Sequence, residues 1–257
     1  MLKTRIIPTL LLRNASLVKT KQFGKFTYVG DPANTVRIFN ELEVDELIFL
    51  DIMASIEKRS PNLKVLSEIA EECFMPLAYG GGLKCLDDVK AIFDIGFEKV
   101  SINSGAIRNP KFISEIAQHY GSQAIIASID VKKSFFGQNT VRYFGARRKA
   151  TYTPVAWAQE LERLGVGEIL LTAVDREGTW EGFDLELTKE VADAVSIPVI
   201  AHGGAGSIQH ICDVVQQANA SAVALGSMVV FQKKGMGVLV NFPDKALIET
   251  ALSKMAN

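Results

Sequence analysis

The sequence predicts a single α/β domain over residues 1–257, folded as a (β/α)8 TIM barrel with an internal half-barrel repeat. Short apolar runs alternate with amphipathic stretches along the whole chain, a pattern typical of repeated βα units on a parallel sheet. Eight such units can be counted, and no linker, low-complexity tract or charge block divides them. A length of 257 residues suits one barrel or two small domains, so the unbroken alternation favours the single barrel.

The eight predicted strands are short runs rich in aliphatic residues. In chain order they are Arg5–Leu12, Glu46–Asp51, Leu77–Tyr79, Lys99–Ile102, Ala124–Asp130, Glu168–Val174, Val199–Ala201 and Ala222–Leu225. The helices expected between and after them are approximately Pro32–Glu43, Pro61–Cys73, Leu86–Ile95, Pro110–His119, Pro154–Leu164, Leu185–Ala194, Ile208–Gln217 and Asp244–Met255. Four of these helices begin at a proline, which a first helical turn tolerates, and Gly96, Gly121 and Gly165 stand where helices would stop.

A longer segment after the fifth strand carries a turn signal of its own. Residues Val131–Ala150 contain alternating β-formers on both sides of Gly137–Asn139. This pattern predicts a β-hairpin that projects from the fifth strand.

Composition and charge indicate a soluble protein with a large core. The chain is 48% hydrophobic and 22% charged, and its net charge of −1 gives no bias toward nucleic acid or a membrane as partner. The apolar run near the start is short and broken by Pro8, so we interpret it as a buried strand of a cytoplasmic protein rather than a signal peptide. The three cysteines lack CxxC spacing and the three histidines lack ligand spacing. No disulfide, metal or cofactor is therefore expected.

An internal repeat relates the two halves of the chain. The segment PLAYGGG at residues 76–82 resembles PVIAHGG at residues 198–204, so that Gly81 and Gly82 recur 122 residues later as Gly203 and Gly204. Each copy is followed by a helix and by a strand that ends in small or polar residues. The alternative is that any two βα units look alike.

Two sets of residues at strand ends are candidate phosphate sites. Glycines just past a strand let backbone N–H groups approach an anion, and the positive end of the following helix adds to the attraction. The first set is Gly81, Gly82, Asn103 and Ser104; the second is Gly203, Gly204, Gly226 and Ser227, with Gly178 and Thr179 on the preceding loop. Active sites of this fold lie at the C-terminal ends of the strands, so a small molecule with two phosphates or a diphosphate would suit both sets. Each glycine pair alone is at least as often a tight turn.

Asp130 ends the fifth predicted strand, at the expected mouth of the barrel. A carboxylate at that position could act as a general acid or base. The alternative is a helix cap or an ion pair with Lys132. The residues alone leave both open.

Four charged residues lie at the opposite ends of predicted strands. Arg5, Glu46, Lys99 and Glu168 each open a strand, so all four belong near the N-terminal face of the barrel, where two cations and two anions could close a ring of salt bridges. Counting by two along the strands places them on the same face as the hydroxyls of Thr9, Ser101 and Thr172, and Asp130 shares a face with Ser128 in the same way. If that face points inward, the ring leads through hydroxyls to Asp130 and suggests a conduit for a small polar molecule. The alternative is that strand-end charges pair for stability.

A series of motifs gives the chain a family resemblance. In order along the chain they are KTRIIPTLLL, DELIFLDIMASIEKR, GGGL, KVSINSGAI, YGSQAIIASID, GEILLTAVDREGT and AHGGAG. Their order and spacing resemble those of the cyclase subunit of imidazole glycerol phosphate synthase, over all eight units and roughly residues 2–231.

The resemblance implies a partner, a gate and a substrate. In that family a glutaminase subunit docks on the N-terminal face and releases ammonia, which passes a salt-bridge gate and reaches a bisphosphorylated ribonucleotide. The gate positions match Arg5, Glu46, Lys99 and Glu168. The positions that match phosphate-binding residues include Gly82, Asn103, Ser104, Gly204 and Ser227, together with Lys19 on the first loop.

The catalytic positions depart from the family pattern. Asp130 matches one of the two catalytic carboxylates, but Leu11 stands where the family has the other. Glu177 replaces an aspartate of the family's DRDG motif, and His202 replaces a serine before the second glycine pair. The candidate catalytic residues are therefore Asp130, Glu177 and His202. Ring closure requires proton transfers on both sides of the substrate, so its loss is expected while ammonia delivery is retained.

Three functions follow from this combination of retained and lost features. The first is a synthase subunit that uses ammonia from a glutaminase for another substrate; the resemblance suggests acetamidino formation on a nucleotide-linked sugar in the biosynthesis of bacterial surface polysaccharides such as O-antigen. The second is a genuine histidine-pathway cyclase that tolerates Leu11. The third is a non-catalytic scaffold that only docks and activates the glutaminase.

Overall fold

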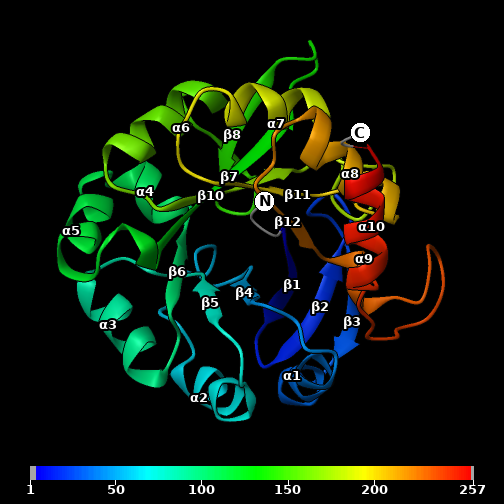
Figure 1. Cartoon of the computed structure of the whole chain (residues 1–257). Coiled ribbons are helices and arrows are strands. Elements are labelled where there is room, and N and C mark those ends of the chain that lie inside the picture. Colours follow the sequence, from blue (N-terminus) through cyan, green and yellow to red (C-terminus); the bar gives the residue numbers. More distant parts are fainter. Residues whose placement is uncertain (1–3, 256–257) are drawn as a thin grey trace.

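Eight parallel strands close into a barrel, which confirms the predicted fold class (Figure 1). A computed structural model describes residues 4–255. The barrel strands are β1 (Arg5–Arg13), β4 (Leu47–Asp51), β5 (Leu77–Gly80), β6 (Lys99–Ile102), β7 (Ile125–Lys133), β10 (Glu168–Ala173), β11 (Val199–His202) and β12 (Ala222–Leu225). Parallel pairing runs through all eight, and the β7–β10 pair completes the circle. Residues 1–3, 256 and 257 of the expected domain lie outside the described part.

The helices form an outer ring around these strands (Figure 1). They are α1 (Pro32–Glu41), α2 (Leu63–Glu72), α3 (Leu86–Ile95), α4 (Ser104–Arg108), α5 (Lys111–Tyr120), α6 (Pro154–Arg163), α7 (Leu185–Ala192), α8 (Ile208–Gln217), α9 (Ser227–Val230) and α10 (Lys245–Met255). The sequence predicted eight of them and missed the one-turn helices α4 and α9. The predicted start of α2 at Pro61 is wrong, because the Asn62 side chain accepts from the backbone N–H of Val65 and caps a helix that begins at Leu63.

Two antiparallel hairpins extend from the C-terminal ends of barrel strands. One was predicted: β8 (Asn139–Tyr143) pairs with the end of β7 and with β9 (Arg148–Lys149). The other, formed by β2 (Ser16–Thr20) and β3 (Phe26–Gly30), pairs with the end of β1 and was read from the sequence as a loop. The alternating β-formers of FTYVG after Gly24 are the signal that could have found it.

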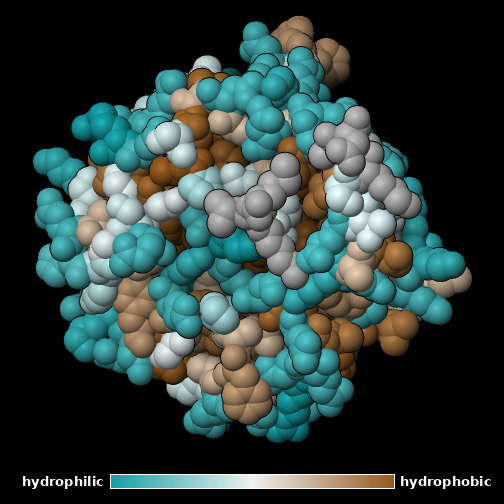
Figure 2. Space-filling model, in the orientation of Figure 1, coloured by the Kyte–Doolittle hydropathy of each residue, from teal (hydrophilic) through white to brown (hydrophobic). Residues whose placement is uncertain are grey.

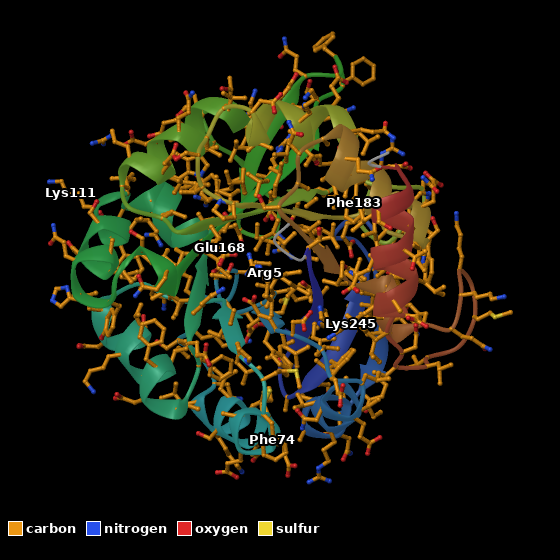
Figure 3. All side chains as sticks on the ribbon, in the orientation of Figure 1. Arg5, Phe74, Lys111, Glu168, Phe183 and Lys245 are labelled. Carbon is orange, nitrogen blue, oxygen red and sulfur yellow. The ribbon has the colours of Figure 1, made fainter. Side chains whose placement is uncertain are left out.

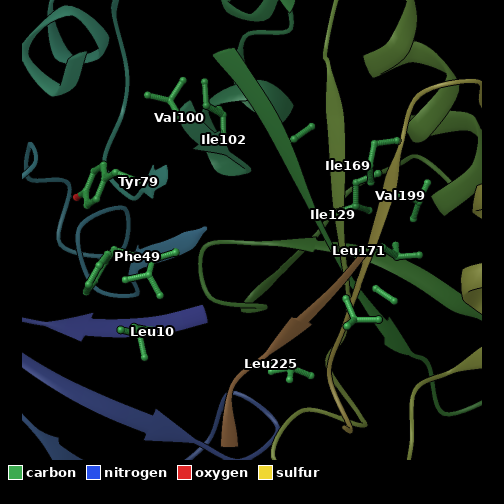
Figure 4. Close-up of a cluster of buried hydrophobic side chains, with 14 of the residues drawn as sticks. Leu10, Phe49, Tyr79, Val100, Ile102, Ile129, Ile169, Leu171, Val199 and Leu225 are labelled. Carbon is green, nitrogen blue, oxygen red and sulfur yellow. The ribbon is translucent and has the colours of Figure 1, made fainter. Parts of the chain in front are cut away.

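The core consists of two shells. The outer shell lies between the strands and the helices and includes Leu10, Phe49 and Tyr79 on neighbouring strands (Figure 4). The inner shell fills the barrel itself and consists of Ile7, Ile48, Ala78, Ile126, Leu170, Ile200, Ala222 and Ala224. Alternate residues of each strand serve the two shells, as the period of two along a β-strand requires.

The glycine pairs of the two halves have similar backbone conformations. Gly81 and Gly82 have φ values of 131° and 73°, and Gly203 and Gly204 have φ values of 96° and 107°. At the next strand end, Asn103 (φ −116°, ψ −80°) corresponds to Gly226 (φ −105°, ψ −88°). This agreement supports the half-barrel repeat that the sequence predicted.

Hydrophilic side chains cover much of the face of the barrel seen in Figure 2, with apolar patches between them. Among residues 4–255, no helix is both long and apolar enough to cross a bilayer.

Candidate active site

The four charged residues at the N-terminal ends of the strands form a closed ring, as the sequence predicted. The guanidinium of Arg5 lies 2.9 Å from the Glu46 carboxylate and 2.6 Å from that of Glu168. The Lys99 ammonium lies 3.0 Å and 2.8 Å from the same two carboxylates. Arg5 and Glu168 lie near the centre of the ring of helices (Figure 3). The charges alternate around the ring, so each carboxylate contacts two cations.

The pKa of the Glu168 carboxyl group reflects this pairing. Burial acts to raise its pKa, but the hydrogen bonds and charges of Arg5 and Lys99 outweigh that effect, so the pKa is lowered. The ring therefore contributes stability above the ordinary pKa of a glutamate and loses it as the pH falls through the lowered value.

An aliphatic layer of three side chains lies between this ring and the barrel mouth. Ile7, Ile48 and Leu170 each follow a ring residue by two positions and belong to the buried inner shell. Ser101 follows the fourth ring residue, Lys99, in the same way, and its hydroxyl lies 2.6 Å from that of Ser128. Within residues 4–255, the buried Oγ1 atom of Thr9 has no hydrogen-bond partner. The expected hydroxyls therefore begin on the strand of Lys99, and the other three ring residues are followed by aliphatic side chains.

A cavity of about 310 Å³ opens at the C-terminal ends of the strands, within the size range of small-molecule sites. One part of its wall is apolar and includes Leu11, Leu50 and Ile102. Another part is polar and includes Asn103, Ser128, Asp130, Thr172 and His202. The structure thus brings all three candidate catalytic residues, Asp130, Glu177 and His202, to the lining of one cavity.

Asp130 lies at the polar wall, and neither alternative suggested for it is observed. Asn103 donates a hydrogen bond of 2.9 Å to its carboxylate, and no ion pair to Asp130 occurs between residues 4 and 255. Burial raises the pKa of Asp130 to about 7, a hydrogen bond from Thr172 opposes the rise, and the charge of Glu177 adds to it. A carboxyl group poised near neutral pH can both accept and donate a proton under working conditions.

His202 belongs to the same hydrogen-bonded row of residues. Asp130, Thr172 and His202 are in register on adjacent strands, and the Thr172 hydroxyl lies 3.1 Å from His202 Nδ1. Which of these two groups donates depends on the tautomer of His202. Burial, with a contribution from the Lys19 charge, lowers the pKa of His202 to about 3.

We therefore expect His202 to remain neutral between pH 5 and pH 8. Its folded pKa lies below the ordinary value near 6.5, so its burial destabilises the protein progressively as the pH falls from about 6.5 toward 3. The measurement is an NMR titration of the imidazole C–H signals, with the His202 signal assigned by its absence in His202→Gln. A His202 signal that titrates near pH 6.5 would contradict this geometry.

Glu177 and Lys19 are engaged with each other. The Lys19 ammonium forms a buried salt bridge with the Glu177 carboxylate. The same carboxylate accepts from the Thr20 hydroxyl at 3.1 Å and from the backbone N–H of Phe23 at 3.2 Å. Glu177 thus fixes the β2–β3 hairpin to the loop after β10 in this conformation.

The second predicted phosphate set lines a separate and much smaller crevice. Gly178, Gly203, Gly204, Gly226 and Ser227 surround about 10 Å³, which is room for one water molecule. A Cβ atom on Gly226 would lie 2.8 Å from Lys19 Cε, so the Lys19 side chain occupies the space beside this glycine. Thr179 lines neither of these two cavities. Its hydroxyl donates to the Arg176 carbonyl within its own loop.

The first predicted phosphate set lines the large cavity. Gly81 and Gly82 pack so closely that an added Cβ would lie 2.7 Å from the carbonyl oxygen of Asp51 and 2.6 Å from that of Arg59, respectively. Their positive φ values also favour glycine. Ser104 accepts a hydrogen bond of 3.0 Å from the backbone N–H of Phe144, which holds the β8–β9 turn at the cavity edge.

Several residues at the cavity were missed by the sequence reasoning. Asp51 lines the cavity and pairs with Arg59 at 2.8 Å, closing the loop after β4. Arg13, Phe26 and Arg147 line the cavity from the hairpin regions. Arg13 and Phe26 could not be assigned to the site because the β2–β3 hairpin was not predicted. No sequence motif points to Arg147. In the part of the chain from residue 4 to 255, no cluster of His, Cys, Asp and Glu suited to a metal ion occurs.

A closed parallel barrel with its cavity at the C-terminal strand ends defines a protein of the (β/α)8-barrel class of enzymes. Residues 5–234 match the family model described as "Histidine biosynthesis protein". The chain therefore belongs to this family, which includes the HisF subunit of imidazole glycerol phosphate synthase.

The chain is similar to several members of the family over nearly its whole length. It is 48% identical to "Putative imidazole glycerol phosphate synthase subunit hisF2" of Pseudomonas aeruginosa, covering 95% of this chain and 97% of that protein. It is 43% identical to the similarly named HisF protein of Leptospira borgpetersenii, over 95% and 96% of the two chains. It is also 43% identical to "Imidazole glycerol phosphate synthase subunit HisF" of Alkaliphilus metalliredigens, over 89% and 90%.

Proposed function

We propose that this chain is a synthase subunit that receives ammonia from a glutaminase docked on the N-terminal face of the barrel and uses it at the C-terminal cavity. The closed ring of Arg5, Glu46, Lys99 and Glu168 is the observation that carries the proposal. It lies at the opposite end of the barrel from Asp130, where a docked subunit could reposition it. The same face would therefore serve as both docking surface and entrance.

The substrate differs from that of the histidine pathway in this proposal. Leu11 is buried and lines the same cavity as Asp130, so the cavity has an apolar side chain where ring closure needs an acid or base. We propose a nucleotide-linked sugar whose acetamido group becomes an acetamidino group, as in the assembly of surface polysaccharides. In the net change a C–N bond forms between ammonia and the amide carbon while the C=O bond breaks, and the oxygen leaves as water with two hydrogens of the ammonia.

The proposal has a direct test in a bacterial strain that lacks the histidine-pathway cyclase. The wild-type chain, expressed with the strain's glutaminase, is expected not to restore growth without histidine. Robust growth would reject the proposal in favour of a genuine cyclase that tolerates Leu11.

Replacing Leu11 by aspartate is expected to create cyclase activity. The new carboxylate would stand across the cavity from Asp130, and a positioned acid or base typically contributes about 10²- to 10⁴-fold in rate. The measurement is the rate of imidazole glycerol phosphate formation by the purified variant with ammonium salt. Leu50→Asp is the matched control, because Leu50 is the register partner of Leu11 and lines the same cavity. Equal activity in the two variants, or none in Leu11→Asp, would contradict the role given to this position.

A further inference from the structure

The mouth of the large cavity is bordered by two hairpins from opposite sides of the barrel. The β2–β3 hairpin, which extends from β1, contributes Phe23 and Phe26 to the lining. The β8–β9 turn, which extends from β7, contributes Gly145 and Arg147. These two edges therefore contribute lining residues on both sides of the cavity.

A cation and an aromatic ring are stacked at the first edge. The guanidinium of Arg13 lies 3.6 Å from the centre of the Phe26 ring. Phe26 remains 48% exposed, although a phenyl ring of this size would ordinarily be buried. The stack forms a flat, positively charged platform, which is the kind of surface on which nucleobases stack in proteins.

The two arginines at the mouth are available to an anion. Neither Arg13 nor Arg147 forms an ion pair with a carboxylate in the described part of the chain. By contrast, Arg59 and Lys19 are paired with Asp51 and Glu177, two carboxylates of the cavity lining. Arginine matches the geometry of phosphate oxygens with paired N–H donors. The lining that contains Gly81 and Gly82 therefore also has two guanidinium groups without a carboxylate partner in the described part of the chain.

The cavity wall next to this mouth also contains a buried hydrogen-bond acceptor that a ligand could use. No donor among residues 4–255 reaches the buried Oδ1 atom of Asn103, while the amide nitrogen of the same side chain donates to Asp130. An unsatisfied buried acceptor is costly, so a bound molecule with an O–H or N–H group would gain a partner there. A sugar hydroxyl or an amide meets that requirement.

We propose that Arg13, Phe26 and Arg147 form a recognition site for a nucleoside diphosphate group. The base stacks on the Arg13–Phe26 platform, Arg147 contacts the diphosphate, and the attached group extends inward past Asn103 toward Asp130. The inference rests on the proposed function and deepens it, because it names the residues that select a nucleotide-linked substrate. It concerns an edge of the cavity distinct from the glycine sets.

The test is calorimetric titration of the full-length chain with uridine 5′-diphosphate, adenosine 5′-diphosphate and inorganic pyrophosphate. Phe26→Ala is expected to weaken binding of both nucleotides roughly tenfold and to leave pyrophosphate unchanged, because only the stacking on the base is lost. Arg147→Gln is expected to weaken all three ligands roughly tenfold, because it removes a charged contact to the diphosphate.

Two neighbouring residues provide matched controls. Phe136 is 87% exposed at the tip of the β7–β8 hairpin, and Arg148 follows Arg147 directly; neither lines the cavity. Phe136→Ala and Arg148→Gln are expected to bind all three ligands within about twofold of wild type. Equal losses in controls and test variants, unchanged nucleotide binding in Phe26→Ala, or no nucleotide binding by wild type at millimolar concentration would each overturn the site.

The failure of this site and the failure of the proposed function give different results. Glutamine-driven amidine formation by Phe26→Ala at the wild-type KM would overturn the recognition site and leave the proposed function standing. Specific nucleotide binding without any glutamine-driven nitrogen transfer would support the site and reject the proposed function.

Discussion

Replacing Asp130 by asparagine is expected to lower glutamine-dependent product formation by about two to four orders of magnitude. Three carboxylates line the large cavity, and two of them are engaged: Asp51 with Arg59, and Glu177 with Lys19. Asp130 is the one of these three carboxylates without an ion pair in the described part of the chain, and its pKa is raised to about 7. Asparagine preserves the shape and the bond to Asn103 but cannot transfer a proton.

The same substitution is expected to increase stability at high pH. The pKa of Asp130 is about 7 in the folded protein and about 3.8 when unfolded, so wild-type stability is fully present below the lower value and declines as the pH rises through the higher one. A difference of about three pH units corresponds to a loss of as much as roughly 4 kcal/mol above pH 7. Asp130→Asn lacks this loss, so its free energy of unfolding should exceed that of wild type at pH 8 by more than at pH 5.

Two measurements separate a catalytic role for Asp130 from a structural one. Denaturant unfolding at the two pH values gives the stability, and product formation with glutamine or ammonium salt gives the activity. Asp94→Asn, on an exposed part of α3, is the control and should change neither. Full product formation by Asp130→Asn would instead support the scaffold hypothesis, in which this chain only activates the glutaminase.

Charge reversal of Lys99 to glutamate is expected to abolish glutamine-dependent nitrogen transfer. The ring would then hold three carboxylates against the single guanidinium of Arg5, and a buried charge without its partner costs about 3 kcal/mol or more. The Glu46 and Glu168 side chains are 6% and 13% exposed, so water relieves little of that repulsion. The free energy of unfolding should fall accordingly.

The decisive measurement for Lys99→Glu is the ratio of glutamine-dependent to ammonium-dependent product formation. Ammonia from the added salt can reach the cavity from the mouth. The ammonium-dependent activity should therefore survive in folded protein, while the glutamine-dependent activity falls more than tenfold. Lys90→Glu makes the same charge change on the exposed surface of α3 and should leave the ratio unchanged. An unchanged ratio in Lys99→Glu would show that the ring is purely structural.

Most of the barrel could be predicted because its pattern is local. Eight strands, eight helices and the β7–β8 hairpin follow from periodicity and turn residues in single stretches of sequence. The ring of Arg5, Glu46, Lys99 and Glu168 also followed, because parallel strands place their first residues on one face.

Features that depend on contacts between distant segments could not be predicted in this way. The pairing of Lys19 with Glu177 joins residues far apart in the chain, and it places a side chain expected to bind phosphate against a carboxylate instead. The β2–β3 hairpin was missed because its strands are short and partly exposed. The aliphatic layer above the ring could not be predicted, because the alternation along a strand does not by itself tell which face points into the barrel.

That aliphatic layer imposes a chemical filter on anything that travels along the barrel axis. An ammonium ion that left the two ring carboxylates would have to lose part of its hydration shell among Ile7, Ile48 and Leu170. Neutral ammonia loses far less, because it has no charge to desolvate. Nitrogen that entered through the ring, as proposed above, would therefore cross this level more readily as the neutral nucleophile than in its protonated form.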